Sequence, residues 1–397
     1  MPHGDSLILT LVAGFVLAFA FGMAARRLRL SPLVGYLMAG VVVGPFTPGW
    51  VADGGIAAQL AEVGVILLMF GVGLHFSPQD LLSVRKVAAP GALIQMGLAT
   101  ALGWGLAVAL GLPGVEGLLL GLCLSVASTV VVLRTLEERK AMKSEAGRIA
   151  IGWLVVQDLI VVVALVLLPL FLTGQTEPAA LARDVGWQLL KVAGFVGLML
   201  VVGGRALPWL LVRIAHTRSR ELFTLGVLAI ALGIAWIAYA LFGASFALGA
   251  FVAGLVLNGS SLGHAAAERS LPLRDAFAVL FFVSVGMLFD PRILLRQPLA
   301  LAGVVAIVLA SGALAALIVA RIARVDRPNA SLLAASLPQI GEFSFVLAGL
   351  GVSLKAMSHA TQSLVVAAAI LSIALNPLLL RLADRRGGPE SGAEAAA

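Results

Sequence analysis

The stretch "IGWLVVQDLIVVVALVLLPL" (Ile151–Leu170) decides the fold, because it is long and apolar enough to cross a membrane as one helix. Gln157 and Asp158 lie side by side near its middle. An ionised carboxylate at the centre of a bilayer costs about 3 kcal/mol or more, so intramembrane acids usually have a function. We therefore expect Asp158 to be protonated, paired or reached by water. The plainer alternative is a carboxyl group hydrogen-bonded to a neighbouring helix.

The composition indicates a helical protein that crosses the membrane many times. Of the 397 residues, 60% are hydrophobic and 12% are charged, and the mean hydropathy is +1.06. Continuous apolar runs recur along the chain, which excludes a soluble domain and a transmembrane β-barrel. We attribute the net charge of +7 to basic cytoplasmic loops rather than to a nucleic acid partner. We find no enzymatic or cofactor motif, so we expect a non-enzyme that needs no cofactor.

Windows of about 20 residues predict thirteen membrane-spanning helices. The expected spans are 6–25, 32–44, 56–75, 87–110, 115–136, 149–172, 186–212, 222–241, 244–259, 272–289, 298–320, 329–350 and 360–382. With thirteen spans, the loops on one side hold 21 of the 27 Lys and Arg residues and those on the other side hold 4. This asymmetry predicts an N-terminus outside and a C-terminus in the cytoplasm.

Two pairs of segments indicate an internal repeat. "LLMFGVGLHFSP" (Leu67–Pro78) matches "LFFVSVGMLFDP" (Leu280–Pro291), and "GYLMAGVVVG" (Gly35–Gly44) matches "GAFVAGLVLN" (Gly249–Asn258). The matched spans are seven spans apart, so they run in opposite directions through the membrane, as in many transporters. The expected division is a first repeat over 1–183, a linker helix over 184–220, a second repeat over 221–383 and a disordered cytoplasmic tail over 384–397.

The spans 115–136 and 329–350 occupy matching positions in the two repeats, and both have interrupted centres. Backbone groups freed by such interruptions need protein or water partners in a membrane. For either span alone, a proline kink or a small-residue packing face is a sufficient explanation. Paired broken helices favour an ion or substrate site. The residues at these centres are Ser125, Ser128 and Thr129 in the first span, and Pro338, Gly341 and Glu342 in the second.

These oxygen-bearing residues predict competition between a proton and a cation. A carboxylate such as Asp158 can hold either ion, whereas Gln157 takes up no proton and can ligate a cation or orient the acid. The expected ion-binding residues are Asp158, Gln157, Ser125, Ser128 and Thr129, since hard oxygen ligands suit alkali-metal ions. If Asp158 alone titrates, one proton exchanges for one monovalent cation and no net charge is transported.

Four motifs share one family resemblance. They are "VVQDLIVVV" (Val155–Val163), "SVASTVVVLRTLEER" (Ser125–Arg139), "PLRDAFAVLFFVSVGM" (Pro272–Met287) and "GEFSFVL" (Gly341–Leu347). They resemble the monovalent cation:proton antiporter family in its Kef-type potassium/proton branch. The resemblance implies thirteen helices, a homodimer, two crossed broken helices, and a core domain that moves like an elevator. It also implies that Asp158 binds the cation and the proton beside Gln157, with Ser125, Ser128, Thr129 and Glu342 in the crossover.

The chain departs from the family in two respects. Relatives that transport net charge have two adjacent acids in place of Gln157–Asp158, and a lysine in the span where this chain has Ser284. This difference favours electroneutral exchange. Kef-type proteins also continue into a cytoplasmic nucleotide-binding domain, and we expect none in "RLADRRGGPESGAEAAA" (Arg381–Ala397).

We therefore expect an antiporter of a bacterial-type inner membrane that exchanges K⁺, or else Na⁺, for H⁺. Glu342, Ser284 and Gly341 are the expected supporting residues. The alternatives are a cation-coupled transporter of an organic solute, a channel and a sensor without transport activity. The residues do not distinguish K⁺ from Na⁺, because both ions bind oxygen ligands.

Overall fold

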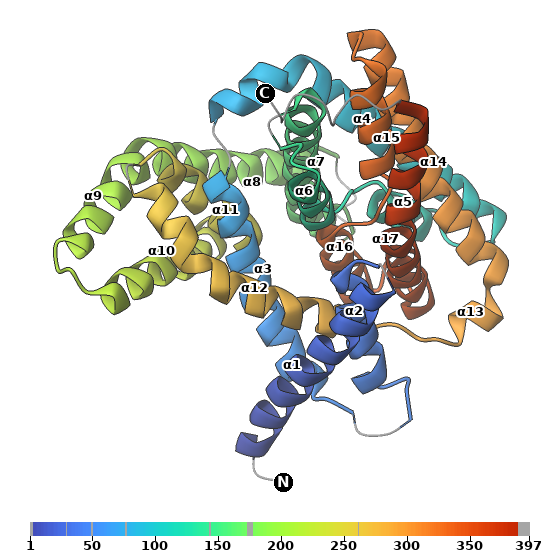
Figure 1. The fold of residues 1–397 in the computed structure, drawn as a ribbon, viewed down its shortest axis with the longest axis horizontal. Coiled ribbons are helices and arrows are strands. Elements are labelled where there is room, and N and C mark those ends of the chain that lie inside the picture. The colour runs from blue at the N-terminus through green and yellow to red at the C-terminus, as the bar shows by residue number, and fades with distance from the viewer. Residues whose placement is uncertain are drawn as a thin grey trace, which may run out of the picture. The chain divides into compact units, whose positions relative to one another are not determined.

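The computed structural model describes residues 3–28, 30–48, 51–75, 78–142, 144–172, 178–260 and 262–387. These residues form helices and no strand (Figure 1). An all-helical chain is what a membrane requires, because a helix satisfies its backbone hydrogen bonds internally. Of the expected tail, residues 384–387 continue the last helix, and residues 388–397 lie outside the described residues.

The helices fall into three successive parts of the chain. The first part has α1 (His3–Arg27), α2 (Pro32–Val43), α3 (Gly54–His75), α4 (Pro78–Ala109), α5 (Gly114–Leu124), α6 (Thr129–Glu138) and α7 (Glu145–Leu172). The middle part has α8 (Pro178–Leu198), the π-helical turn η1 (Met199–Gly203) and α9 (Gly204–Ala215). The last part has α10 (Arg220–Phe242), α11 (Phe246–Asn258), α12 (Gly263–Met287), α13 (Ile293–Arg296), α14 (Pro298–Ala323), α15 (Arg327–Ser336), α16 (Glu342–Ser353) and α17 (His359–Gly387).

Each of the thirteen expected spans has a counterpart among the described residues. Nine are long apolar helices able to cross a membrane, and four are the shorter apolar helices α2, α5, α11 and α16. The starts of two spans were predicted too late, since α4 begins at Pro78 rather than at 87 and α12 begins at Gly263 rather than at 272. Both extra segments are polar, and a hydropathy window detects only the apolar part of a helix.

The predicted interruptions are confirmed, and they fall at equivalent places in the two halves. The first separates α5 from α6 at residues 125–128, and the second separates α15 from α16 at residues 337–341. Glu342, which starts α16, lies 213 residues after Thr129, which starts α6. The same spacing relates the starts of α5 and α15, and it equals the offset of the first matched pair of segments.

The chain divides into two compact units. Unit 1 comprises Met1–Phe19, Val42–Leu81 and Val162–Met287, and unit 2 comprises Ala20–Val41, Leu82–Val161 and Leu288–Ala397. In unit 1, α3 packs against both α11 and α12. Two glycines allow the closest approach, because a β-carbon on Gly254 of α11 would collide with the carbonyl oxygen of Phe70 and lie 3.0 Å from the Cα of Gly73 on α3.

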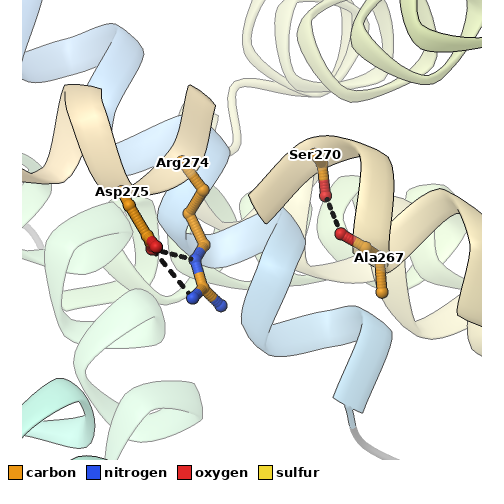
Figure 2. Close-up of polar contacts among 4 residues, drawn as sticks. All are labelled: Ala267, Ser270, Arg274 and Asp275. Atoms are coloured by element: carbon orange, nitrogen blue, oxygen red, sulfur yellow. Dashed lines mark hydrogen bonds and ion pairs between the residues drawn. The ribbon is translucent and has the colours of Figure 1, made fainter. Parts of the chain in front are cut away.

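A second close contact in unit 1 involves a charged residue. The aliphatic stem of Arg274 on α12 lies against Gly71 of α3. The Arg274 guanidinium donates hydrogen bonds to Asp275 at 2.9 and 3.1 Å, and Figure 2 shows the two side chains pointing toward each other. One turn earlier on α12, the Ser270 hydroxyl donates to the carbonyl oxygen of Ala267 at 3.0 Å (Figure 2). Glycine at position 71 therefore makes room for a long basic side chain between two helices.

The core of unit 2 forms around Trp153 of α7, which is completely buried. Alanine and leucine side chains from α4, α6, α14 and α15 surround it. Gly91 of α4 leaves room for the indole ring, since a β-carbon at that position would overlap it. Small residues let membrane helices approach closely, and the large ring fills the space between them.

We expect Gly254→Ala to destabilise the protein by about 1–3 kcal/mol, because the added methyl group meets backbone that cannot move without separating α11 from α3. The matched control is Gly233→Ala on α10, where no atom lies within 4 Å of the added methyl group. Alanine favours helices, so the control should keep or slightly raise stability. Thermal unfolding of both purified variants in detergent measures the difference, and equal melting temperatures would contradict the described contact.

Candidate ion-binding site

The first interruption, residues 125–128, is held open by local hydrogen bonds of serine. The Ser125 hydroxyl donates to the carbonyl oxygen of Leu122 at 2.7 Å. The Ser128 hydroxyl accepts a hydrogen bond from the backbone amide of Val131 at 3.3 Å, as an N-terminal capping residue does. Such bonds compete with the regular helical pattern and explain why the helix breaks here without a proline.

Gln157 of α7 satisfies the backbone groups that this interruption frees. Its Oε1 accepts from the amide of Ala127 at 3.2 Å, and its Nε2 donates to the carbonyl oxygen of Ser125 at 3.1 Å. Nε2 also donates to Oε1 of Gln95 on α4 at 3.0 Å, and Gln95 accepts a further hydrogen bond from the Trp153 indole at 2.7 Å. Gln157 and Gln95 are buried. The amide of Gln157 therefore supports the broken helix directly.

The second interruption, residues 337–341, has a proline at its centre and is supported by α17. Pro338 lacks an amide hydrogen and disfavours continuation of the helix. The amide of Ile340 donates to the Ser372 hydroxyl at 3.3 Å. The Asn376 side chain donates to the carbonyl oxygen of Ala335 at 2.9 Å. Thus α7 and α17, the helices that follow the two broken helices in the chain, each supply side chains to the nearby interruption.

The two interruptions also contact each other. The amide of Gly341 donates to the carbonyl oxygen of Val126 at 2.9 Å, and the Ser344 hydroxyl donates to the carbonyl oxygen of Cys123 at 2.6 Å. A β-carbon on Gly341 would lie 2.5 Å from the carbonyl oxygen of Ala127, so only glycine permits this approach. The broken helices therefore meet at their gaps, which is the arrangement that the family resemblance implied.

Two buried carboxyl groups lie at this crossing. Thr129, the first residue of α6, donates from its hydroxyl to Oδ2 of Asp158 at 3.1 Å. The adjacent Ser128 donates to Oε2 of Glu342 at 3.4 Å. Asp158 Oδ1 and Glu342 Oε1 are both buried and have no hydrogen-bond partner among the described residues. Consecutive hydroxyl groups thus hold two acids, and each acid keeps one free oxygen.

The charge of these acids is not balanced by any basic side chain that the structure describes. Within the part of the chain that the structure describes, no Lys or Arg forms an ion pair with Asp158 or Glu342. The favourable fields come from backbone, because α6 begins at Thr129 and α16 begins at Glu342, and the N-terminus of a helix carries partial positive charge. Chemically, a proton or a small cation is the missing counter-charge at such a site.

Unit 2 brings together seven of the eight predicted site residues. These are Asp158, Gln157, Ser125, Ser128 and Thr129 of the expected ion-binding set, with Gly341 and Glu342 of the supporting set. Ser284 lies on α12 in unit 1, where its side chain is half-buried. Four further polar residues at the site were not predicted, because their only signal is an isolated polar residue within an apolar helix: Gln95, Ser344, Ser372 and Asn376.

The family described as "Sodium/hydrogen exchanger, transmembrane" matches residues 13–382 of the chain. The chain is 57% identical over 389 residues to YbaL of Escherichia coli (strain K12), whose name assigns it provisionally to cation/proton antiport. That match covers 97% of this chain and 70% of YbaL. The chain is 33% identical over 378 residues to K(+) efflux antiporter 4 of Arabidopsis thaliana, covering 95% of this chain and 64% of that protein.

The fold is similar to the solved structure of the sodium proton antiporter MjNhaP1 from Methanocaldococcus jannaschii. The TM-score is 0.71, and the match covers 96% of this chain and 98% of that one. The two sequences are 19% identical, so this likeness shows a shared fold and nothing finer.

We expect Gln157→Leu to destabilise the protein by at least about 2 kcal/mol, because it leaves the Ala127 amide and the Ser125 carbonyl without their buried partner. The matched control is Gln59→Leu, an exposed position of α3, which should change stability by about 0.5 kcal/mol at most. Thermal unfolding in detergent measures both effects. Similar stability of the two variants would mean that Gln157 does not support the interruption.

Proposed function

This chain belongs to the transmembrane sodium/hydrogen exchanger family, and we propose that it exchanges a monovalent cation for H⁺ at Asp158. The expected resemblance to the Kef-type branch is confirmed by its relatives. The observation that carries the proposal is the free, buried Oδ1 of Asp158 beside the Thr129 hydroxyl, with no basic partner among the described residues. The apolar helices and the family membership make the chain an integral membrane protein.

The exchange rests on competition for one carboxylate. A protonated Asp158 is neutral and compatible with its buried position, and so is Asp158 paired with a monovalent cation. In the cation-bound state, Oδ1 and Oδ2 of Asp158 and the Thr129 hydroxyl supply hard oxygen ligands of the kind alkali-metal ions prefer. An ionised Asp158 without either ion is the costly state. One ion therefore replaces the other at Asp158, and the ionised, unoccupied carboxylate is not a stable state of the site.

Gln157 serves this mechanism by positioning rather than by binding the ion. Its Oε1 already accepts from the Ala127 amide, and its Nε2 makes two hydrogen bonds. These bonds fix the end of the interruption from which α6 starts, and Thr129 is the first residue of α6. Ser125 likewise uses its hydroxyl on the carbonyl oxygen of Leu122. Thr129 and Ser128 are thus the hydroxyl residues that contact the acids, at Asp158 and Glu342 respectively.

We propose K⁺ as the favoured cation. The support is the relative from Arabidopsis thaliana, which is named for K⁺ efflux and is 33% identical over 95% of this chain. The likeness to a sodium proton antiporter reaches only to the fold and leaves Na⁺ as the second candidate. An organic solute gains no support from this family membership. Proton release from proteoliposomes pulsed in turn with K⁺, Na⁺, Li⁺ and Rb⁺ ranks the ions directly.

The proposed stoichiometry is one proton for one cation. Gln157 occupies the position beside Asp158 and carries no charge, so a single acid on α7 meets the transported ions. Glu342 is the other acid at the crossing, and it starts α16, where the helix dipole stabilises a negative charge. We assign Glu342 a fixed structural role that leaves the count of transported protons unchanged.

The way the site is built supports alternating access. Among the described residues, the groups that hydrogen-bond to Asp158, Glu342 and the two interruptions belong to unit 2. A movement of unit 2 as a rigid body would carry the site intact, which supports an elevator-type mechanism. A homodimer, a bacterial-type inner membrane and an N-terminus outside the cell complete the proposal, with support from the family resemblance and the loop charges.

We expect Asp158→Asn to reduce cation-dependent proton release to the level of empty liposomes, because an amide of the same size neither releases a proton nor balances a cation. The matched control is Glu62→Gln, an exposed acid of α3, which should retain exchange. A pH-sensitive dye inside proteoliposomes gives the rates, and size-exclusion chromatography verifies folding. Exchange retained by folded Asp158→Asn would eliminate the carboxylate mechanism.

We expect the steady-state ion gradients to be insensitive to an imposed membrane potential. Moving one net charge through 100 mV is worth about 2.3 kcal/mol, which would shift the gradients about 50-fold. A one-for-one exchange shifts them by less than about twofold, and Glu342→Gln should behave in the same way. The measurement uses proteoliposomes clamped at 0 and at 100 mV, with Na⁺ or Li⁺ as the transported ion. A shift near the larger value would mean that net charge crosses the membrane.

A further inference from the structure

A pocket in unit 2 has neither of the two buried acids in its lining. Its volume is about 520 Å³, within the range of small-ligand sites. It is bounded by the end of α1, the start of α2, the length of α6 and the second half of α17. Arg26, Arg139 and Arg381 contribute from three separate segments, so the pocket gathers positive charge that is scattered in the sequence.

The charge of this pocket is only partly balanced. Arg139 donates two hydrogen bonds to Asp384, at 2.6 and 3.0 Å. Among the described residues, no carboxylate pairs with Arg26 or Arg381. Counted over the described side chains, the pocket therefore has a surplus of two positive charges, which repels a cation and attracts an anion. This sign distinguishes it from the acidic crossing, so it is a poor entrance for the transported ion.

The remaining lining of the pocket is largely apolar. Leu30, Val131 and Ile373 are among the side chains that face it, and Thr135 adds a buried hydroxyl group. Arginine binds phosphate through two parallel hydrogen bonds, and apolar walls suit the glycerol and upper acyl region of a lipid. Arg26 and Arg139 lie at helix ends, and Arg381 lies in the last two turns of α17. All three are on the side that the loop charges predict to be cytoplasmic, where membranes carry anionic lipids.

We propose that this pocket binds the phosphate headgroup of an anionic membrane phospholipid. Arg26 and Arg381 hold the phosphate, because their guanidinium groups are not engaged by a described carboxylate. Arg139 stays tied to Asp384 and contributes to the positive field. The inference rests on the pocket and its charge, not on the proposed ion exchange, and binding can be measured without any transport.

The test is a titration of purified protein with short-chain phosphatidylglycerol in detergent, followed by native mass spectrometry. Near a membrane surface each arginine is worth about fivefold in affinity, so the double variant Arg26→Gln/Arg381→Gln should raise the dissociation constant about 25-fold. The matched control is Arg27→Gln/Arg385→Gln, which removes the same charge from exposed neighbours that do not line the pocket. The control should stay within about twofold of the natural sequence.

Three results would overturn the proposal. An equal loss of affinity in both double variants would mean that diffuse surface charge attracts the lipid. Equal binding of short-chain phosphatidylcholine would mean that the charge of the headgroup is not recognised. Inorganic phosphate that binds as tightly as the lipid would identify a site for a soluble anion. Melting temperatures without lipid verify that all variants are folded, and all four substituted positions are exposed.

Discussion

The inability of hydrocarbon to form hydrogen bonds constrains this structure more than any other factor. Two broken helices expose backbone amides and carbonyls where no lipid atom can satisfy them. The chain solves this by crossing the interruptions, so that the Gly341 amide reaches the carbonyl oxygen of Val126. Side chains of the following helices, such as Gln157 and Ser372, satisfy other groups. The same bonds set the start of α6, and with it the hydroxyl groups that meet the acids.

The distribution of charge within unit 2 follows from this arrangement. At the crossing, Asp158 and Glu342 lack basic partners among the described residues and depend on helix ends and hydroxyl groups for compensation. At the ends of the helices, arginines gather around a separate pocket with the opposite sign. In a cation transporter, an acidic site such as this crossing responds to whether an ion is bound. The arginine-lined pocket does not attract the transported cation, because like charges repel.

Hydropathy was sufficient to predict the number of spans. Each span must be a helix with apolar side chains that satisfies its own backbone hydrogen bonds, and hydropathy detects those side chains. Pro338 indicated the second interruption, and Ser125, Ser128 and Thr129 indicated the first. Gln157 from another helix satisfies the backbone groups that the first interruption frees. The position of Gln157 in the sequence did not decide its role. The same side-chain amide can bind a cation or form hydrogen bonds with the backbone of the interruption. Gln95 went unnoticed because its partners, Trp153 and Gln157, are distant in sequence and no periodicity links them.

The bond between Gly341 and Val126 joins main-chain atoms on both sides, and this has an evolutionary consequence. Any sequence able to follow the same backbone path keeps that bond, whatever side chains it carries, provided a glycine-sized residue stands at the point of contact. Side chains elsewhere can then be substituted during evolution while the two broken helices still cross. Distant chains with few identical residues can accordingly retain the same fold. Selection can then change ion preference by substituting side chains, without altering the backbone arrangement.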